Sequence, residues 1–245
     1  MKAILVGYGE VGRGVFGVLS QNHLVHVEDP KYGLVADSEM YYDILLIAIP
    51  YSDEFIDIVQ KFEQRFIPDV TIIFSSVPIG TCRKLGAIHS PIEGHHDNMV
   101  ESIRSHKRWV GGWSNVAKIF FENAGLEVRM LSNPEATEFM KLQSTTIYGI
   151  NIEWARYCKK MADQIGFDFE DLKLYNIDYN NLVIDIHKNP NYIRYNLDPP
   201  EGKIGGHCVL PNAKLLMNGH GHPFIQTLRQ GHPFIQTLLD LNEDQ

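Results

Sequence analysis

The sequence predicts an α/β fold that begins with a doubly wound parallel sheet and continues into a smaller, all-helical domain with one long helix. Short aliphatic runs alternate with segments of helical spacing as far as Leu131, which is typical of a parallel sheet covered by helices on both faces. A glycine-rich turn follows the first aliphatic run. From Glu135 to Ile165 there is no proline, and apolar residues recur at helical intervals, which predicts the long helix.

The elements of the first domain follow from this alternation in chain order. Strands are predicted over its β-branched and aliphatic runs: Lys2–Val6, His23–Val27, Asp43–Pro50, Val70–Phe74, Ala87–Ile88, Trp109–Val110 and Leu126–Leu131. Helices are predicted over the amphipathic segments between them: Glu10–Ser20, Phe55–Phe62 and Asn115–Glu122. We expect the hydroxyl of Ser52 to cap the second of these helices.

The composition changes at Asn133-Pro134, after which the chain is predicted to be helical. We place the first domain at residues 1–128, the helical domain at 129–217 and a tail at 218–245. A second helix of the helical domain is predicted over Asp168–His187. In the tail Gly221–Leu228 recurs at Gly231–Leu238. We interpret this duplicated decamer as a tandem duplication or a sequence artefact, because two copies are too few for a repeat fold.

Composition excludes several classes of protein. The 245 residues carry 22 Lys+Arg against 30 Asp+Glu, a net charge of -8, which disfavours binding to a phosphate backbone and hence to nucleic acid. The chain has no apolar run of about 18 residues, the length that would span a membrane. The cysteines are few and far apart, which indicates a reducing compartment: Cys82, Cys158 and Cys208. We therefore expect a cytoplasmic protein.

The first strand ends in a GxGxxG motif that opens a helix: Gly7-Tyr8-Gly9-Glu10-Val11-Gly12. Gly7 permits a tight turn, Gly9 lets the backbone approach a pyrophosphate, and Gly12 lets the helix pack closely on the strand. The helix N-terminus faces the negative charge of the ligand. This arrangement predicts a Rossmann domain that binds a dinucleotide.

An acidic pair, Glu28-Asp29, ends the second strand about 20 residues further on, where an acid would bind the ribose hydroxyls and repel a 2′-phosphate. The cofactor is therefore predicted to be NAD and not NADP. Glu28 is the preferred residue because it directly follows the last apolar residue of the strand. Residues that follow the third and fourth strands are also assigned to cofactor binding: Ile49, Pro50 and Ser75.

A cysteine beside glycines is the second chemical signal, in Ile204-Gly205-Gly206-His207-Cys208. Glycines allow a ligand close to the backbone, and His207 is suited to stabilise a thiolate on Cys208. A buried structural cysteine is the alternative, and the residues alone do not decide between them.

Three motifs occur in the order and approximate spacing of a known family: Ser75-Ser76-Val77-Pro78-Ile79-Gly80-Thr81, the helical Glu138-Phe139-Met140-Lys141-Leu142-Gln143-Ser144-Thr145, and Gly205-Gly206-His207-Cys208-Val209-Leu210-Pro211-Asn212. With the glycine motif, they make the chain resemble the UDP-glucose/GDP-mannose dehydrogenases, closest to the UDP-N-acetylmannosamine dehydrogenase branch. The resemblance covers residues 1–216.

The resemblance implies that a nucleotide sugar is the small-molecule substrate and that its primary alcohol is oxidised by two NAD in succession. Cys208 would be the nucleophile, forming a thiohemiacetal and then a thioester, and Lys141 would stabilise the oxyanion. Ser76 stands where the family orders a water, and Glu93 lies near the family's SPE segment. The resemblance also implies a homodimer through the long helix. From the residues alone, Lys141 beside Glu138 would form a solvated surface pair.

The chain departs from the family pattern at several points. Asn212 replaces an Asp and is unable to accept a proton as a carboxylate does. Thr145 replaces an Asn, and Pro211 is displaced by one position. The family's C-terminal nucleotide-sugar-binding domain has no counterpart in this sequence. A partner chain would then complete the site, the substrate would be smaller, or turnover would be lost.

Other functions compatible with the sequence are a non-catalytic, regulatory NAD-binding protein and a two-electron dehydrogenase of the 3-hydroxyacid type. The second would rely on Lys141 without covalent chemistry at Cys208. A metal hydrolase built from His89, His95, His96 and Asp97 has no ligand spacing that supports it. We therefore predict no metal.

Overall fold

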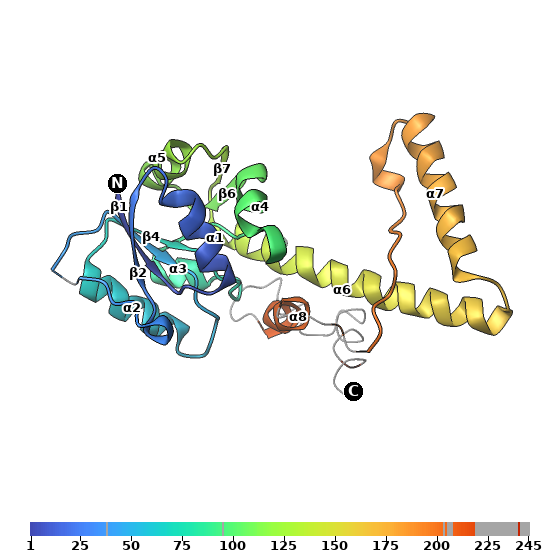
Figure 1. Cartoon of the computed structure of the whole chain (residues 1–245), viewed down its shortest axis with the longest axis horizontal. Helices are drawn as coiled ribbons and strands as arrows, with labels where there is room; N and C mark the ends of the chain where they lie inside the picture. The colour runs from blue at the N-terminus through green and yellow to red at the C-terminus, as the bar shows by residue number, and fades with distance from the viewer. Residues whose placement is uncertain (38, 95, 203, 205–207, 219–239, 241–245) are drawn as a thin grey trace. The chain divides into compact units, whose positions relative to one another are not determined.

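The computed structural model describes residues 1–37, 39–94, 96–202, 204, 208–218 and 240 (Figure 1). The chain divides into two compact units, residues 1–142 and 143–217. Their boundary falls inside the long helix α6 (Pro134–Ile165). The decamer repeat of the tail lies outside the described residues.

The first unit is built on a seven-stranded sheet with the order β2-β1-β3-β4-β5-β6-β7. The strands are β1 (Lys2–Val6), β2 (Leu24–Glu28), β3 (Ile44–Ile47), β4 (Val70–Ile73), β5 (Ile88–His89), β6 (Arg108–Gly111) and β7 (Val128–Leu131). Neighbouring strands pair in parallel, except that β5 and β6 pair antiparallel through His89 and Gly111. The predicted doubly wound parallel sheet is thus confirmed, with one antiparallel pair.

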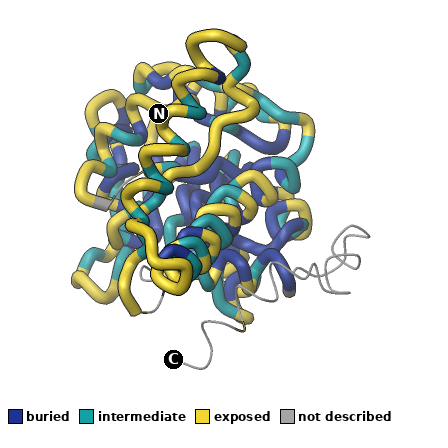
Figure 2. The backbone as a smooth tube through the Cα atoms, turned by 90° about the vertical axis from the view of Figure 1, so that its right-hand side faces the viewer, coloured by how far each residue is buried: buried dark blue, intermediate teal, exposed yellow. Residues whose placement is uncertain are grey.

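Helices cover both faces of the sheet because alternate residues of each buried strand point to opposite sides. Ala3 and Leu5 of β1 pack with α1 (Glu10–Leu19), α4 (Met99–Ser105) and α5 (Asn115–Asn123). Ile4 and Val6 pack on the opposite side with α2 (Phe55–Phe66) and α3 (Thr81–Leu85). Figure 2 shows the buried backbone in dark blue, enclosed by exposed yellow segments.

Two local expectations were wrong in the first unit. Ser52 does not cap α2, since the N-cap is Glu54 and no side chain bonds there; only the carbonyl of Ser52 accepts a bond, from the N–H of Phe55. Helices α3 and α4 were not predicted, and α3 has only 5 residues, too short for a periodic pattern. Gly80 and Gly86, whose backbones lie in the left-handed region, are the N-cap and the C-cap of α3.

The second unit contains the rest of α6, then α7 (Phe169–Asp185) and α8 (Val209–Asn218). Gly166, at φ +87°, follows the last residue of α6, and the Asp168 side chain caps α7 by accepting a bond from the N–H of Glu170. The predicted helices of this region are confirmed, while α8 was not predicted. Short 3₁₀ turns complete the described chain: η1 (Pro30–Tyr32), η2 (His96–Asn98) and η3 (Pro190–Tyr192).

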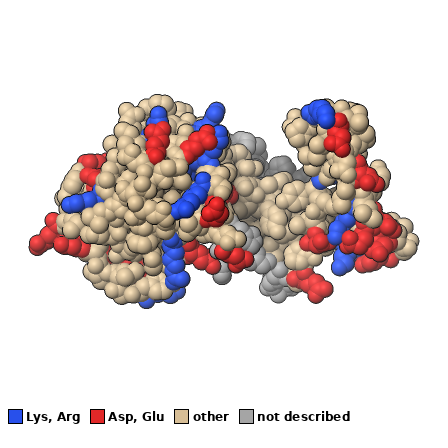
Figure 3. Space-filling model, turned by 45° about the horizontal axis from the view of Figure 1, so that its top comes forward, with Lys and Arg blue, Asp and Glu red and all other residues tan. Residues whose placement is uncertain are grey.

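The surface carries charges of both signs. On the face shown in Figure 3, acidic and basic side chains are interspersed and no broad basic area occurs. Within the described residues, every helix is too short or too polar to cross a lipid bilayer.

Candidate active site

The glycine motif forms the turn between β1 and α1. Gly7 has φ +95°, and a Cβ there would lie 2.6 Å from the carbonyl oxygen of Ala48. A Cβ on Gly12 would lie 2.0 Å from the carbonyl oxygen of Gly7. Both positions therefore require glycine for packing alone. Gly9 differs, because a Cβ there would meet nothing within 4 Å and its backbone has φ −71°, which any residue adopts.

The packing of this turn leaves open space beside Gly9, at the N-terminus of α1. Gly9 is the N-cap of α1, and it has no side chain that could cap the helix. The first N–H groups of a helix have no partner within the helix and carry partial positive charge. Within the motif, Glu10 is exposed and Tyr8 and Val11 are half-buried. The observed turn thus fits the pyrophosphate of a dinucleotide.

The two acids at the end of β2 have different surroundings. Glu28 is 5% exposed, and its carboxylate accepts hydrogen bonds from Arg65 at 2.8 Å and from the N–H of Ala36 at 2.7 Å. Asp29, the next residue, accepts a bond from the N–H of Tyr8 at 2.7 Å. Successive side chains of a strand point to opposite sides, so only one of the two faces the glycine turn. That residue is Asp29.

Aromatic and basic side chains that the sequence analysis did not select surround Asp29. Its second oxygen accepts a bond from the N–H of Lys31 at 3.0 Å, which caps η1 and places Tyr32 near the glycine turn. The rings of Tyr8 and Tyr32 are 6.3 Å apart, and the Arg13 guanidinium lies 5.0 Å from the Tyr32 ring centre. In the sequence, the signal for Tyr32 was an aromatic residue three positions after Asp29.

The ends of β3 and β4 are joined by a hydrogen bond between two of the predicted cofactor-binding residues. The hydroxyl of Ser75 donates to the carbonyl of Ile49 at 2.6 Å, directly before Pro50. Ser76, next in the chain, is half-buried. Carboxyl ends of parallel strands form the usual ligand-binding edge of such sheets.

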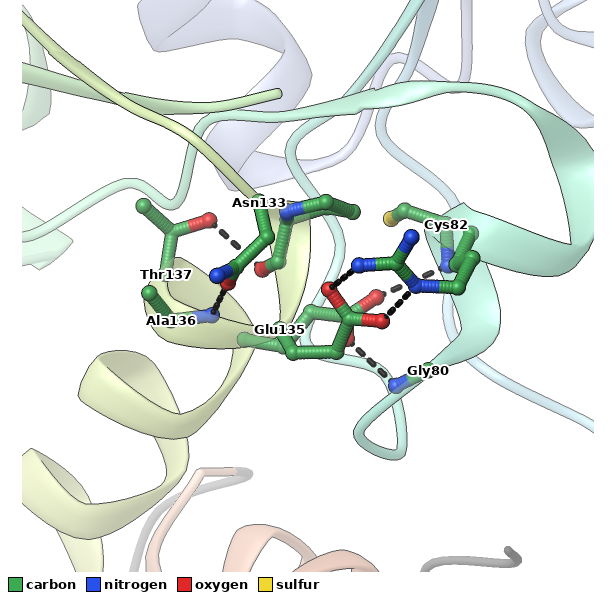
Figure 4. A network of polar contacts seen from close by, with 9 residues as sticks. Gly80, Cys82, Asn133, Glu135, Ala136 and Thr137 are labelled. Atoms are coloured by element: carbon green, nitrogen blue, oxygen red, sulfur yellow. Dashed lines mark hydrogen bonds and ion pairs between the residues drawn. The ribbon is translucent and has the colours of Figure 1, made fainter. Parts of the chain in front are cut away.

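Glu138 of α6 fixes the loop that follows Ser76. Its carboxylate, on a fully buried side chain, accepts bonds from the N–H groups of Gly80 at 2.6 Å and Cys82 at 2.8 Å (Figure 4). Burial raises the pKa of Glu138, and these hydrogen bonds oppose the shift. Nearby, Glu135 forms an ion pair with Arg83. The first turns of α6 are therefore tied to the loop between β4 and α3.

Lys141 lies one turn after Glu138 and is not a solvated surface lysine. Its side chain is only 13% exposed. Its ammonium donates to the carbonyl of Ile92 at 2.7 Å and to the Glu93 carboxylate at 3.3 Å. The structure thus brings together the predicted residues Lys141 and Glu93, and the expected alternative of a surface pair with Glu138 is wrong.

His89 is a fully buried neighbour of this lysine. One ring nitrogen lies 3.2 Å from the carbonyl of Ser75 and the other 2.9 Å from the hydroxyl of Thr137. Desolvation, together with the positive charge of Lys141, lowers the pKa of His89 to about 3, so the ring is neutral at physiological pH. Because a carbonyl only accepts, we assign the proton to Nε2.

Both nitrogens of His89 are thus engaged, and neither is available to a metal. Across the described part of the chain, no group of three or more His, Cys, Asp and Glu side chains is placed to hold a metal ion. His95, another member of the considered metal set, lies outside the described residues.

The second unit contains the other predicted catalytic residues. Cys208 is half-buried and directly precedes α8, and its carbonyl accepts a bond from the N–H of Asn212 at 3.0 Å. The Asn212 side chain, on a residue 3% exposed, donates to the hydroxyl of Thr145 at 2.9 Å. The two positions that depart from the family pattern therefore bond to each other. Gly205–His207 lie outside the described residues.

Arg108, at the start of β6, is a further residue that the sequence analysis missed. It is 1% exposed, and its guanidinium donates to the carbonyl of Pro91 at 2.8 Å. A charged residue at the start of an apolar strand is normally solvated, so the sequence offered no signal for its burial.

Solved structures of dehydrogenases share this fold. The UDP-D-ManNAc dehydrogenase of Pyrococcus horikoshii has a TM-score of 0.74 at 15% identity, over 99% of this chain and 68% of its own. The 3-hydroxyisobutyrate dehydrogenase of Mycobacterium tuberculosis has a TM-score of 0.71 at 13% identity, over 99% of this chain and 92% of its own. The GDP-mannose dehydrogenase of Pseudomonas aeruginosa has a TM-score of 0.61 at 14% identity, over 100% of this chain and 69% of its own.

Comparison of the sequence with protein-family models and with curated proteins gives no match. The structural similarities therefore establish the fold, which the chain shares with these dehydrogenases at low sequence identity. At the level of fold, the resemblance to nucleotide-sugar dehydrogenases is confirmed.

Proposed function

We propose that this protein is an NAD-dependent oxidoreductase that oxidises a primary alcohol and is similar in type to the nucleotide-sugar dehydrogenases. The observation that carries the proposal is the open space at Gly9, beside an uncapped helix N-terminus and the carboxylate of Asp29. No packing contact requires a glycine at this position, whereas a bound pyrophosphate does.

The cofactor would be held by groups of the first unit. The N–H groups at the start of α1 would bind the pyrophosphate, and Asp29 would accept hydrogen bonds from the ribose hydroxyls. Glu28 would instead support the fold through Arg65. Ile49, Pro50 and Ser75 would complete the edge of the sheet. Bound NAD supplies the hydride acceptor.

Lys141 would act on the oxygen of the alcohol as it gains negative charge. Its ammonium donates to the carbonyl of Ile92 and to the Glu93 carboxylate, and these two contacts fix its position. A positioned cation stabilises such charge strongly where water is scarce. Glu93 would hold the Lys141 ammonium in place, and Ser76 would order a water.

Cys208 would carry the covalent step. Its thiol would release a proton to water and the sulfur would add to the aldehyde carbon, forming a C–S bond while the carbonyl oxygen takes up the electron pair. Asn212 has no carboxylate to accept the thiol proton. Because it bonds to the carbonyl of Cys208 through its N–H and to Thr145 through its amide, its proposed role is to position the start of α8.

A 3-hydroxyacid-type dehydrogenase is the second candidate. It is favoured by Asn212, which lacks the carboxylate that the covalent mechanism would use, and by the fold shared with the 3-hydroxyisobutyrate dehydrogenase at a TM-score of 0.71. In that case Lys141 would stabilise the charge on the alcohol oxygen, and Cys208 would take no part in the reaction.

Binding of the cofactor is tested by titrating NAD into matched variants. Gly9→Ala is expected to keep the unfolding midpoint of the wild type and to weaken NAD binding by about ten-fold or more, because its methyl group occupies the pyrophosphate position. Asp29→Asn is expected to weaken binding, while the control Glu28→Gln leaves the Kd for NAD unchanged. Equal Kd values for wild type and Gly9→Ala would contradict the proposed site.

Turnover is tested by NADH absorbance with UDP-sugars, GDP-sugars, simple sugar alcohols and 3-hydroxy acids. Lys141→Met is expected to lower kcat by about 100-fold or more, the usual effect of removing an oxyanion-stabilising group. Loss of turnover in Cys208→Ala would support the nucleotide-sugar type, and retained turnover the 3-hydroxyacid type. NAD binding without any turnover would identify a binding protein.

The proposed assembly is a homodimer formed through α6. Its exposed apolar side chains support this, among them Trp154 at 60% and Tyr157 at 53% exposure, with rings stacked 5.6 Å apart. Large apolar side chains grouped on a surface favour association. Light scattering on Trp154→Glu should show a monomer where the wild type shows a dimer.

A further inference from the structure

Arg108 is an unusual charge in the interior of the first unit. It is the largest of the fully buried side chains, and its Nε and Nη1 atoms have no hydrogen-bond partner within the described structure. Burial lowers the pKa of Arg108 to about 10, so the guanidinium is still a cation at neutral pH. Burying an arginine that has no hydrogen-bonded carboxylate is costly, and an apolar residue of similar volume often serves stability as well. Stability alone therefore does not account for Arg108.

The one hydrogen bond described for this guanidinium connects it to the surroundings of Lys141. Nη2 of Arg108 donates to the carbonyl of Pro91 at 2.8 Å. The next carbonyl, that of Ile92, accepts from Lys141 at 2.7 Å, and the following side chain, Glu93, accepts from the same ammonium at 3.3 Å. Three successive residues thus connect the two cations.

Charge strengthens this connection. Arg108 attracts Glu93, the one carboxylate that opposes the burial effect on its pKa. Glu93 therefore interacts with both Arg108 and Lys141. His89 adds no charge because its ring is neutral. The positive charge of Arg108 acts on the same segment that fixes the Lys141 ammonium.

We infer that Arg108 is a positioning residue, which holds Pro91–Glu93 against β6 so that Ile92 and Glu93 fix the ammonium of Lys141. The inference rests on the proposed function only in treating Lys141 as the cation that meets the substrate. The geometry of the lysine is a property of the free protein and is measured without turnover.

The test is the reactivity of individual lysines toward an amine-acetylating reagent, read by peptide mass spectrometry on the full chain. The variants are Arg108→Met, which keeps the volume without the charge, and Arg108→Lys, which keeps a charged donor. Lys118, exposed on α5, serves as the internal reference. All samples are labelled well below their unfolding midpoints, and the Kd for NAD is measured in parallel.

In Arg108→Met we expect Lys141 to be labelled about ten-fold faster relative to Lys118, because release of the segment exposes the amine. Arg108→Lys should return the rate to within about two-fold of the wild type, since one donor again reaches Pro91. A loosened fold would accelerate labelling in both variants alike, so only rescue by lysine supports positioning.

The inference is overturned if Lys141 is labelled at the wild-type rate in Arg108→Met, or if both variants are labelled equally fast. Should Arg108→Met not fold, Arg108→Gln replaces it, because its amide ends short of the guanidinium position and carries no charge. Failure of the wild type to bind NAD would contradict the proposed function and would leave the labelling comparison intact. The two failures are therefore distinguishable.

Discussion

The sheet unit and the helical unit bury their apolar residues to different degrees. Helix α2, with 12 residues, buries Phe55, Val59 and Phe66 against the sheet. Helix α7, with 17 residues, has one buried residue, Val183. Several of its large apolar side chains are exposed: Leu174, Tyr175, Ile177, Leu182 and Ile184.

Among the described residues, α7 therefore lacks the packing that the sheet gives to the helices of the first unit. Helical stability in proteins comes mainly from packing of an apolar face, and isolated helices are marginal in water. The sheet supplies that packing for α1, α2 and α5. For α7 it has to come from another surface, consistent with the proposed homodimer.

Truncating one apolar side chain in each unit tests this contrast most directly. Phe120→Ala should cost about 3–5 kcal/mol, because Phe120 is fully buried beside the sheet. Leu174→Ala, at 57% exposure, should cost less than about 0.5 kcal/mol at low protein concentration. Urea unfolding measures both. A loss at Leu174 that grows with protein concentration would show that a second copy covers it.

Gly12→Ala should destabilise the sheet unit by about 3 kcal/mol. Its new methyl carbon would lie 2.0 Å from the Gly7 carbonyl oxygen, and the N–H of Gly7 is itself bonded to the Glu28 carbonyl. Gly9→Ala is the matched control and should change stability by less than about 0.5 kcal/mol, because it meets nothing. Similar unfolding midpoints for the two variants would contradict this account of the turn.

His89 should make the sheet unit sensitive to acid. The pKa of His89 is about 3 in the folded protein and 6.5 as the reference value, so between these pH values the unfolded chain binds a proton that the folded protein does not. This proton uptake should lower the free energy of unfolding by about 1.4 kcal/mol for each pH unit as the pH decreases through this range.

The measurement is urea unfolding from pH 7 to pH 4 in the wild type and in His89→Gln, which does not titrate. The variant is expected to be less stable at pH 7 and to lose less stability on acidification. If the free energy of unfolding depends on pH in the same way in both proteins, the assignment of a buried, neutral His89 ring is wrong.

The smallest effect is expected from a surface ion pair. Glu122→Gln removes the pair with Lys118, whose atoms are 3.7 Å apart on side chains nearly half exposed, and should change stability by less than about 0.5 kcal/mol. Glu28→Gln should cost about 2 kcal/mol, because the Glu28 side chain is 6% exposed and bonded to Arg65 at 2.8 Å. Thermal unfolding of both variants compares them, and equal shifts would argue against the burial of Glu28.

Local sequence was sufficient for the strands and for the long helix, since continuous aliphatic runs and helical spacing are properties of neighbouring residues. The glycine motif predicted the turn as well, although only Gly12 is required by a contact within the β-turn-α segment, whereas Gly7 is required by Ala48 at the end of β3. The choice between Glu28 and Asp29 required the position of the glycine turn in the structure. The side of the sheet to which each acid points depends on where β2 ends.

The amino-acid sequence alone was enough to predict the doubly wound sheet and the long helix. Which charges are buried, and which partners they have, follows only from the folded structure. Glu138, Lys141, Glu93 and Arg108 come from segments far apart in the chain, and their contacts arise when α6 packs beside the ends of β4, β5 and β6. Periodicity reports the face on which a residue lies, whereas the pairing of buried charges depends on the distances that folding creates between distant segments.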